Sequence, residues 1–130
     1  MSDKAVLQKL LVKEGYRFLL LRAPGGYLAA AGEPPAGVVI ETDPGSPGPF
    51  DVIQDFVTTQ VQVEERLAGL AELLKPRGLL WITYPKGAAR IKSDVNRDTI
   101  WRYARTIGLD AVAMISVDDV WSAMRIKVAA

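Results

Sequence analysis

The sequence contains no cysteine and no histidine among its 130 residues. These two absences exclude a thiolate nucleophile, a serine and histidine couple, a structural zinc site and an iron–sulfur cluster. We therefore assign no metal-ligating residues, although carboxylates could still hold magnesium or calcium. Chemistry that only positions a cofactor and a substrate also stays open. The lack of cysteine is compatible with a reducing cytoplasm.

Long apolar runs and a strong charge of either sign are lacking as well. No run approaches the roughly 18 residues that a membrane span needs, and the charged N-terminus does not resemble a signal peptide. Sixteen basic and fifteen acidic residues leave a formal net charge of +1. We expect a cytoplasmic protein in which residues 1–130 form a single domain, since this length suits one hydrophobic core.

The apolar residues that are present follow an alternation of strand and helix patterns. Residues 1–15 are expected to form a helix packed on the domain, capped by Ser2, and its apolar stripe is Val6, Leu7, Leu10 and Leu11. Strands are expected at 16–21, 37–40, 51–57, 79–84 and 111–117. Helices are expected at 27–31, from Thr58 or Thr59 through Leu74 to a stop at Pro76, and from Ser93 or Asp94 to Gly108.

Two segments determine how this α/β domain should be connected. Residues 43–49 contain five prolines or glycines in seven, which excludes a helix and a central strand. Residues 120–128 alternate with period two after a short Asp118-Asp119 connection, which predicts an antiparallel hairpin. The pattern predicts a three-layer, Rossmann-like wound sheet that is mostly parallel and ends in that hairpin.

Four features resemble the fold of class I S-adenosylmethionine-dependent methyltransferases across residues 15–128. They are a glycine turn after the first strand, an acidic residue after the second, the segment Leu73–Trp81, and the terminal hairpin. The combination of Tyr84-Pro85-Lys86 with Asp118 and Trp121-Ser122 resembles a group of small bacterial proteins of unknown function. Residues 43–49 stand where the family has its third strand and its adenine-contacting loop. The resemblance is therefore to a shortened, degenerate member.

The resemblance implies a cofactor site at the carboxyl ends of the strands, where ligands bind in wound sheets. The family's acidic, glycine-rich first loop here reads Leu21-Arg22-Ala23-Pro24-Gly25-Gly26, so an arginine replaces the acidic residue. Glu41 matches the family position whose carboxylate holds the ribose hydroxyls. The expected crevice contains Arg22, Gly25, Gly26, Glu41, Asp55, Thr58 and Thr59. The alternative is that the glycines only make a turn and the threonines only cap a helix.

A second cluster is expected at the same edge, where the strand ending at Tyr84 neighbours the last strand. Its members are Tyr84, Lys86, Asp118, Asp119, Trp121 and Ser122. Lys86 with Asp118 or Asp119 is a candidate catalytic pair, and the Trp121 indole could bind a planar ring or a cation. The alternative is a surface ion pair beside a core tryptophan.

Residues 86–105 carry a net charge of +4. This segment could attract phosphate or nucleic acid through Arg90 and Lys92. The alternative is a solvated helix with the pairs Asp94–Arg97 and Asp98–Arg102. A sequence pI near 8.0 makes nucleic acid the less favoured partner.

Three functions follow from these observations. The leading hypothesis is a non-catalytic methyltransferase-like domain, without a cofactor, that binds a partner or small ligand at the carboxyl edge of its sheet. The second is a small methyltransferase in which Gly25, Gly26 and Glu41 hold S-adenosylmethionine and a homodimer partner completes the pocket through the edge near residues 37–49. The third is an anion or nucleic-acid binding module using Arg22, Lys86, Arg90 and Lys92.

Overall fold

A computed structural model describes residues 5–87 and 89–128 of the chain. The strands are β1 (Arg17–Leu21), β2 (Val39–Glu41), β3 (Phe50–Phe56), β4 (Leu74–Pro85), β5 (Leu109–Ser116) and β6 (Trp121–Val128). The helices are α1 (Val6–Lys9), α2 (Tyr27–Ala31), α3 (Gln60–Glu72) and α4 (Arg97–Thr106). Strands and helices alternate from β1 to β5 except between β2 and β3, which a connector without a helix joins, as the sequence predicts.

All six strands form one sheet in the order β2-β1-β3-β4-β6-β5. The first four run parallel, and β6 is antiparallel to both β4 and β5. The predicted mostly parallel sheet with a terminal antiparallel hairpin is confirmed. Within the part of the chain that the structure describes, no strand lies between β2 and β3, so the third strand of the family pattern is missing as expected.

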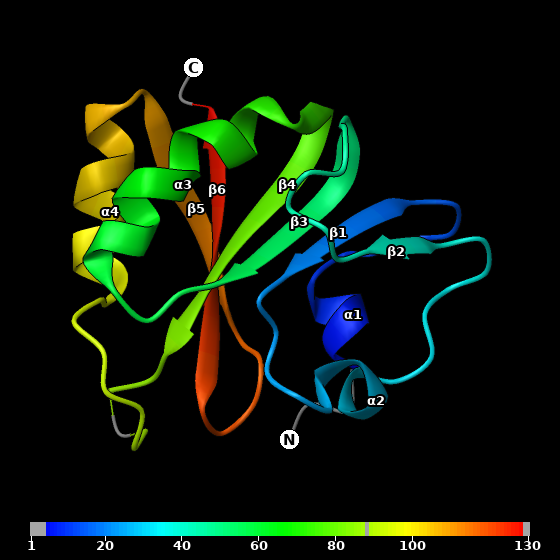
Figure 1. Cartoon of the computed structure of the whole chain (residues 1–130), viewed down its shortest axis with the longest axis horizontal. Helices are drawn as coiled ribbons and strands as arrows, with labels where there is room; N and C mark the ends of the chain where they lie inside the picture. The colour runs from blue at the N-terminus through cyan, green and yellow to red at the C-terminus, as the bar shows by residue number, and fades with distance from the viewer. Residues whose placement is uncertain (1–4, 88, 129–130) are drawn as a thin grey trace.

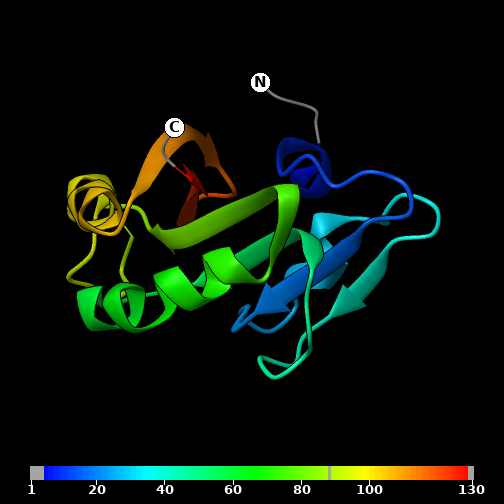
Figure 2. The ribbon, with the colours of Figure 1, turned by 90° about the horizontal axis from the view of Figure 1, so that it is seen from above.

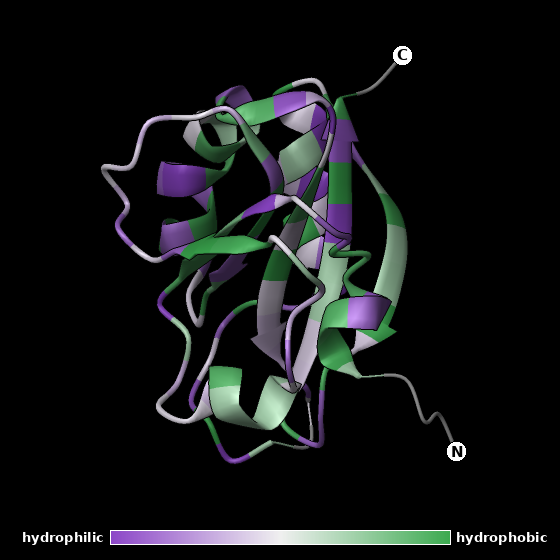
Figure 3. Ribbon diagram, turned by 90° about the vertical axis from the view of Figure 1, so that its right-hand side faces the viewer, coloured by the Kyte–Doolittle hydropathy of each residue, from purple (hydrophilic) through white to green (hydrophobic). Residues whose placement is uncertain are grey.

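Helices cover both faces of this sheet, which gives the three predicted layers (Figure 1). Seen from above, α1 lies on one side of the sheet and α3 lies on the other (Figure 2). One buried cluster joins α1 and α2 to the sheet, and the other joins α3 and α4 to the opposite face. Viewed toward the β2 edge, α2 is mostly hydrophobic (Figure 3), which is consistent with its position against the core.

The N-terminal segment packs on the domain as predicted, but its helix is shorter. Within residues 5–15 the structure has only the single turn α1, and the predicted cap at Ser2 lies outside the described residues. Leu11 is exposed and has a left-handed φ of 63°, so its predicted place on the buried stripe is wrong. The chain turns there and buries Val12 instead. The carbonyl of Leu10 accepts a hydrogen bond from Trp81 Nε1 at 3.0 Å, which fixes the segment to β4.

Helix α3 begins at a predicted cap and ends earlier than predicted. The Thr59 hydroxyl accepts a hydrogen bond from the Gln62 backbone N–H at 3.2 Å, which confirms Thr59 as the cap. Leu74 does not lie on the helix, because it opens β4 and pairs with Phe50 of β3. Backbone pairing with a distant strand therefore ends the helix before Pro76 is reached.

Helix α4 also begins later than predicted. Its cap is Asn96, whose Oδ1 accepts hydrogen bonds from the backbone N–H groups at 98 and 99. The predicted start at Ser93 or Asp94 is wrong, because the Asp94 carboxylate accepts a hydrogen bond from the Gln60 backbone N–H at 2.6 Å. Arg97 lies 3.8 Å from Asp98 and does not form the expected pair with Asp94.

In residues 5–87 and 89–128, no helix is long and apolar enough to span a membrane.

Candidate functional site

The carboxyl ends of the four parallel strands meet at one edge of the sheet. β1 lies between β2 and β3, and the chain leaves β1 and β3 toward helices on opposite faces. The crevice between these two strand ends is therefore the switch point at which wound sheets bind ligands. Arg22 follows β1, Thr58 follows β3 and Lys86 follows β4. The sequence prediction that these three residues share one rim is confirmed.

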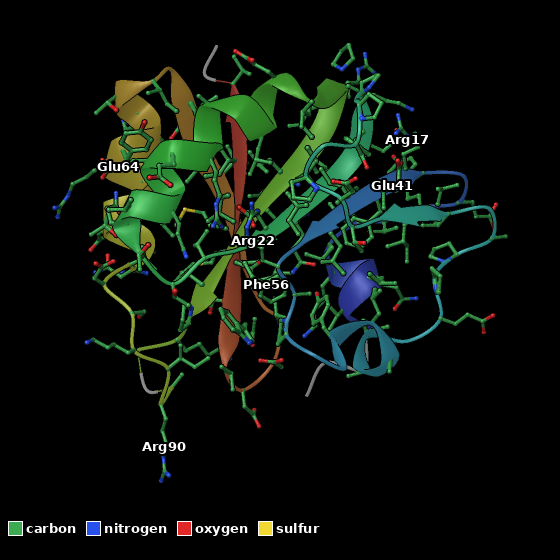
Figure 4. The ribbon with its side chains drawn as sticks, in the orientation of Figure 1. Arg17, Arg22, Glu41, Phe56, Glu64 and Arg90 are labelled. Carbon is green, nitrogen blue, oxygen red and sulfur yellow. The ribbon has the colours of Figure 1, made fainter. Side chains whose placement is uncertain are left out.

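An ion triad crosses this switch point. Arg22 Nη1 lies 3.1 Å from one oxygen of the Asp55 carboxylate, and Arg66 Nη1 lies 3.4 Å from the other. Asp55 has no exposed surface, whereas the side chain of Arg22 is 38% exposed. Burial raises the pKa of the Asp55 carboxyl, and the two guanidinium groups offset part of that rise. Arg22 thus bridges the ends of β1 and β3 (Figure 4).

The backbone at Arg22 supports this bridge. Arg22 has a φ of 60°, in the left-handed region that residues other than glycine rarely adopt. This conformation ends β1 immediately after Leu21, which lies opposite Asp55 in the β1–β3 register. The sequence analysis placed Asp55 in the crevice but missed Arg66. The helical pattern places Arg66 beside the buried stripe of α3, but only the packing of α3 on the sheet shows that its guanidinium reaches Asp55.

A buried polar network lies on the other face of the same strands. The Tyr27 hydroxyl donates to Gln54 Oε1 at 2.9 Å, and Gln54 Nε2 donates to the Thr83 hydroxyl at 3.1 Å. Burial raises the pKa of Tyr27 to about 12. These hydrogen bonds connect α2, β3 and β4 beneath the rim. The side chains are therefore paired with one another, which leaves none of them unpaired for a ligand.

An aromatic row extends this network across the sheet. The ring of Phe56 meets Tyr27 edge-to-face at 4.9 Å and Trp121 at 5.0 Å between centroids. Trp121 is 8% exposed, so the indole contributes to the core. Phe56, labelled in Figure 4, is the last residue of β3.

A pocket of about 440 Å³ opens beside Arg22 at the ends of β1 and β2. Its lining consists of Leu20, Arg22, Ala23, Pro24, Gly26, Tyr27, Leu28, Ala29 and Thr42. This volume lies in the range of small-molecule sites, roughly 300–1,000 Å³. Gly26 has a φ of 81° and precedes α2, so glycine is required there by the turn. The sequence analysis named Arg22 and Gly26 but missed Leu28 and Thr42 as lining residues.

The other predicted cofactor residues lie outside this pocket. Glu41 pairs with Arg17 at 2.8 Å, and Figure 4 shows the two side chains together near the start of β1. Arg17 also donates to the carbonyls of Pro47 and Pro49, so this pair anchors the connector between β2 and β3. No role for Arg17 was predictable from the sequence, because its partners become neighbours only in the folded sheet.

Thr58 and Thr59 serve the start of α3. The backbone N–H groups of both residues donate to Gln62 Oε1, at 2.7 and 3.2 Å. The Thr58 carbonyl accepts from the Asp94 backbone N–H at 3.2 Å. In this structure both threonines therefore contribute to helix capping and loop attachment.

The second predicted cluster is also assembled at this edge. Tyr84 lies opposite Ser122 and Pro85 opposite Trp121 in the β4–β6 ladder. The side chains divide between the two faces, since Tyr84 belongs to the core under α3 and α4, and Trp121 to the core under α1 and α2. The two aromatic side chains of the cluster therefore lie on opposite faces of the sheet.

The charged members of this cluster bind neighbouring groups. Lys86 Nζ donates to the Ser116 hydroxyl at 2.7 Å, and the described residues show no ion pair between Lys86 and a carboxylate. One oxygen of Asp118 accepts from the backbone N–H groups of Val120 and Trp121, both at 2.8 Å, and closes the turn between β5 and β6. Asp119 is exposed in that turn.

The remaining predicted cations project into solvent. Arg90 and Lys92 are exposed in the segment between β4 and α4, and Figure 4 shows Arg90 pointing away from the domain. Arg105 lies over the Trp101 ring at 5.2 Å. Among the residues with described positions, no group of three or more acidic side chains could hold a metal ion.

No protein-family model and no curated protein sequence matches the chain. Solved structures do match. A ribosomal protein L11 methylase from Lactobacillus delbrueckii subsp. bulgaricus superposes with a TM-score of 0.67 at 12% identity, over 96% of this chain and 75% of its own. A SAM-dependent methyltransferase from Aquifex aeolicus gives 0.66 at 16% identity, over 93% and 86%. The DhpI complex with SAH gives 0.63 at 9% identity, over 96% and 82%.

These likenesses establish the fold of the chain. At such identities they carry no residue roles, because one fold hosts many functions. The chain has a class I SAM methyltransferase-like fold in 130 residues, as the sequence resemblance predicts.

Proposed function

We propose that this chain is a methyltransferase-like domain that binds a small neutral or anionic ligand in the Arg22 pocket without transferring a methyl group. The observation that carries the proposal is the ion triad at the switch point. Arg22 stands where the family has an acidic residue, and its guanidinium lies 3.1 Å from the buried Asp55 carboxylate. The charged groups at the ends of β1 and β3 are therefore already paired with each other.

The residues present do not fit a sulfonium donor. S-adenosylmethionine carries a positively charged sulfur, and among the described residues that line the pocket the one charged side chain is the cation Arg22. Neither nearby carboxylate is free to balance that charge, because Asp55 is paired with two arginines and Glu41 with Arg17. The connector at residues 42–49 replaces the segments that would form the adenine side.

The same pocket suits a ligand with a negatively charged or hydrogen-bond-accepting group. The half-exposed guanidinium of Arg22 can donate to a carboxylate or a carbonyl, because only one of its nitrogens is engaged with Asp55. Pro24, Leu28 and Ala29 provide apolar wall around it. A small ligand with one acidic or strongly accepting group and an apolar body would use both features.

One observation favours the alternative of a small methyltransferase. The pocket of about 440 Å³ opens at the carboxyl ends of β1 and β2, beside the loop that leads into α2. This is the place where the fold binds its cofactor. In that alternative, a second copy of the chain would have to supply the adenine wall.

Calorimetry with S-adenosylmethionine and S-adenosylhomocysteine separates the two functions. We expect no heat of binding at millimolar concentration, and no transfer from a labelled donor to any acceptor in a cell extract. Binding of either compound, or acceptor labelling above background, would contradict the proposal.

A second measurement tests the ligand class. Thermal unfolding is followed with a panel of mono- and dicarboxylic acids, because a ligand that binds the folded state raises its melting temperature. A stabilising acid should lose its effect in Arg22→Ala and keep it in Arg90→Ala, which removes an exposed cation elsewhere. Equal loss in both variants would show a general charge effect and reject the assigned pocket.

A further inference from the structure

The opposite edge of the sheet contains a groove where two neighbouring strands diverge. The β4–β6 ladder ends at Leu80 and Ile126, yet β4 begins at Leu74 and β6 continues to Val128. The first residue of β4 pairs with Phe50 of β3, which draws the start of β4 away from β6. Figure 1 shows the start of β4 and the end of β6 separating at the top of the view.

The groove between these strand ends has a volume of about 460 Å³. Residues 75–78 are paired with neither β3 nor β6, because the β3–β4 register jumps from Leu74 to Leu79. All four of these residues line the groove. Apolar side chains form much of the remaining wall, among them Leu79, Val112 and Val128.

Four cations converge on this groove. Its lining residues include Lys75, Arg77, Arg125 and Lys127, and none of the lining residues that the structure describes is acidic. Lys75 pairs with Asp51 at 3.2 Å. Among the residues that the structure describes, no carboxylate forms an ion pair with the other three.

The fold itself explains why these charges gather. Arg125 and Lys127 are two residues apart in β6, so they point to the same face of the sheet. Arg125 lies opposite Trp81 in β4 and Ala113 in β5. Lys75 and Arg77 come from the irregular start of β4, on the other side of the groove. Like charges that line one groove repel one another, and a bound polyanion relieves that repulsion.

We propose that this groove binds a small ligand that carries two or more phosphate groups, of the nucleoside di- or triphosphate class. Arginine guanidinium groups bind phosphate oxygens in bidentate geometry, and Lys127 adds a third unpaired cation. The apolar wall at Leu79, Val112 and Val128 accommodates the rest of the ligand. The site is independent of the Arg22 pocket, because it lies at the other edge of the sheet.

The observations favour a small ligand over a nucleic-acid strand. The volume matches that of small-molecule sites. The chain as a whole has a formal net charge of +1. A protein that binds along a nucleic-acid backbone normally has a much higher positive charge, spread over an extended surface.

Calorimetry on the full chain at low salt tests this site with adenosine triphosphate, tripolyphosphate and inorganic phosphate as probes. We expect adenosine triphosphate and tripolyphosphate to bind more tightly than inorganic phosphate. Arg77→Ala and Lys127→Ala should each raise the Kd of adenosine triphosphate about tenfold, the effect of losing one charge-assisted hydrogen bond. Arg90→Ala, which removes a distant exposed cation, should leave the Kd unchanged.

Three outcomes would overturn the proposal. The first is no binding of adenosine triphosphate or tripolyphosphate by folded protein at low salt. The second is equal weakening by Arg77→Ala and Arg90→Ala, which would show general charge attraction only. The third is an oligonucleotide that binds more tightly than adenosine triphosphate through the same groove residues, which would assign the groove to nucleic acid. The Arg22 pocket is tested separately, with carboxylic acids and Arg22→Ala, so failure of this groove leaves the proposed function of that pocket untouched.

Discussion

Two cavities of nearly equal size lie at opposite ends of the strands. The pocket at the carboxyl ends of the parallel strands, the carboxyl edge, has about 440 Å³, and the groove where β4 begins, the amino edge, has about 460 Å³. They differ in how charge is arranged. At the carboxyl edge, two arginines share the buried carboxylate of Asp55. At the amino edge, Arg77, Arg125 and Lys127 have no ion-pair partner among the described residues.

This difference shows what each edge contributes. A buried carboxylate with two cations is part of the internal structure, because leaving it unpaired is costly in a region without water. Exposed cations on strand ends contribute little to folding, so their charge remains available to a ligand. The carboxyl edge should therefore govern stability, and the amino edge should govern the attraction of anions.

The largest expected effect comes from removing both cations of the triad. Arg22→Ala with Arg66→Ala leaves Asp55 buried without a partner and should lower the free energy of unfolding by roughly 3–5 kcal/mol at pH 7. Urea unfolding followed by circular dichroism measures the loss. The matched control is Arg90→Ala with Lys92→Ala, which removes two exposed cations and should cost less than about 0.5 kcal/mol.

Lowering the pH and adding a third substitution, Asp55→Asn, both test whether the loss of stability comes from the unpaired Asp55 carboxylate. The loss should shrink as the pH falls, because Asp55, whose pKa is raised by burial, takes up a proton in the folded state and no longer needs a cation. Adding Asp55→Asn to the double variant should restore part of the lost stability. Equal losses in the triad variant and its control would contradict the structural role of the triad.

A smaller effect is expected at the network beneath the rim. Tyr27→Phe removes the donor to Gln54 Oε1 and leaves that oxygen buried, which should cost about 1–3 kcal/mol at neutral pH. The unfolded chain loses the tyrosine proton near pH 10, whereas the folded protein holds it until the raised pKa of about 12. Wild-type stability should therefore fall across this interval.

Tyr27→Phe has no hydroxyl group at this position that could lose a proton. The difference in unfolding free energy between Tyr27→Phe and the wild type should narrow from pH 10 to 12, by up to roughly 2–3 kcal/mol. Unfolding curves of both proteins at pH 7, 10 and 11.5 test this. A gap that stays constant would show that Tyr27 titrates normally.

The smallest effect on stability is expected at the amino edge. Arg77→Ala and Lys127→Ala should each change the free energy of unfolding by less than about 0.5 kcal/mol, or raise it slightly by relieving repulsion. The same urea titration measures both. A loss above about 2 kcal/mol in either variant would mean that these cations have structural partners, and the contrast between the two edges would disappear.

Local patterns in the sequence predicted much of this fold. Thr59 is a confirmed helix cap because capping depends on residues within one turn. The alternation in residues 120–128 correctly predicts the β6 hairpin, because period two describes a strand wherever it lies. The predicted ends were wrong where a distant partner intervened, as at Leu74, which joins β3, and at Asp94, which binds the start of α3.

The candidate sites were predictable only in part. The rim shared by Arg22, Thr58 and Lys86 follows from parallel strands ending at one edge. Arg66 was missed, because pairing with Asp55 depends on how α3 is rotated over the sheet. The alternation in β6 places Arg125 and Lys127 on one face, but nothing in the sequence indicates that β4 diverges beside them.

The sequence by itself determined the class of the domain, the parallel order that precedes a final hairpin, and the absence of thiol and imidazole chemistry. Those properties depend on composition and on short-range periodicity. Only the tertiary structure decided that Glu41 pairs with Arg17, that Arg22 closes on Asp55, and that a cationic groove opens at the opposite edge. Such contacts join residues far apart in the chain, and their geometry exists only once the strands are in register.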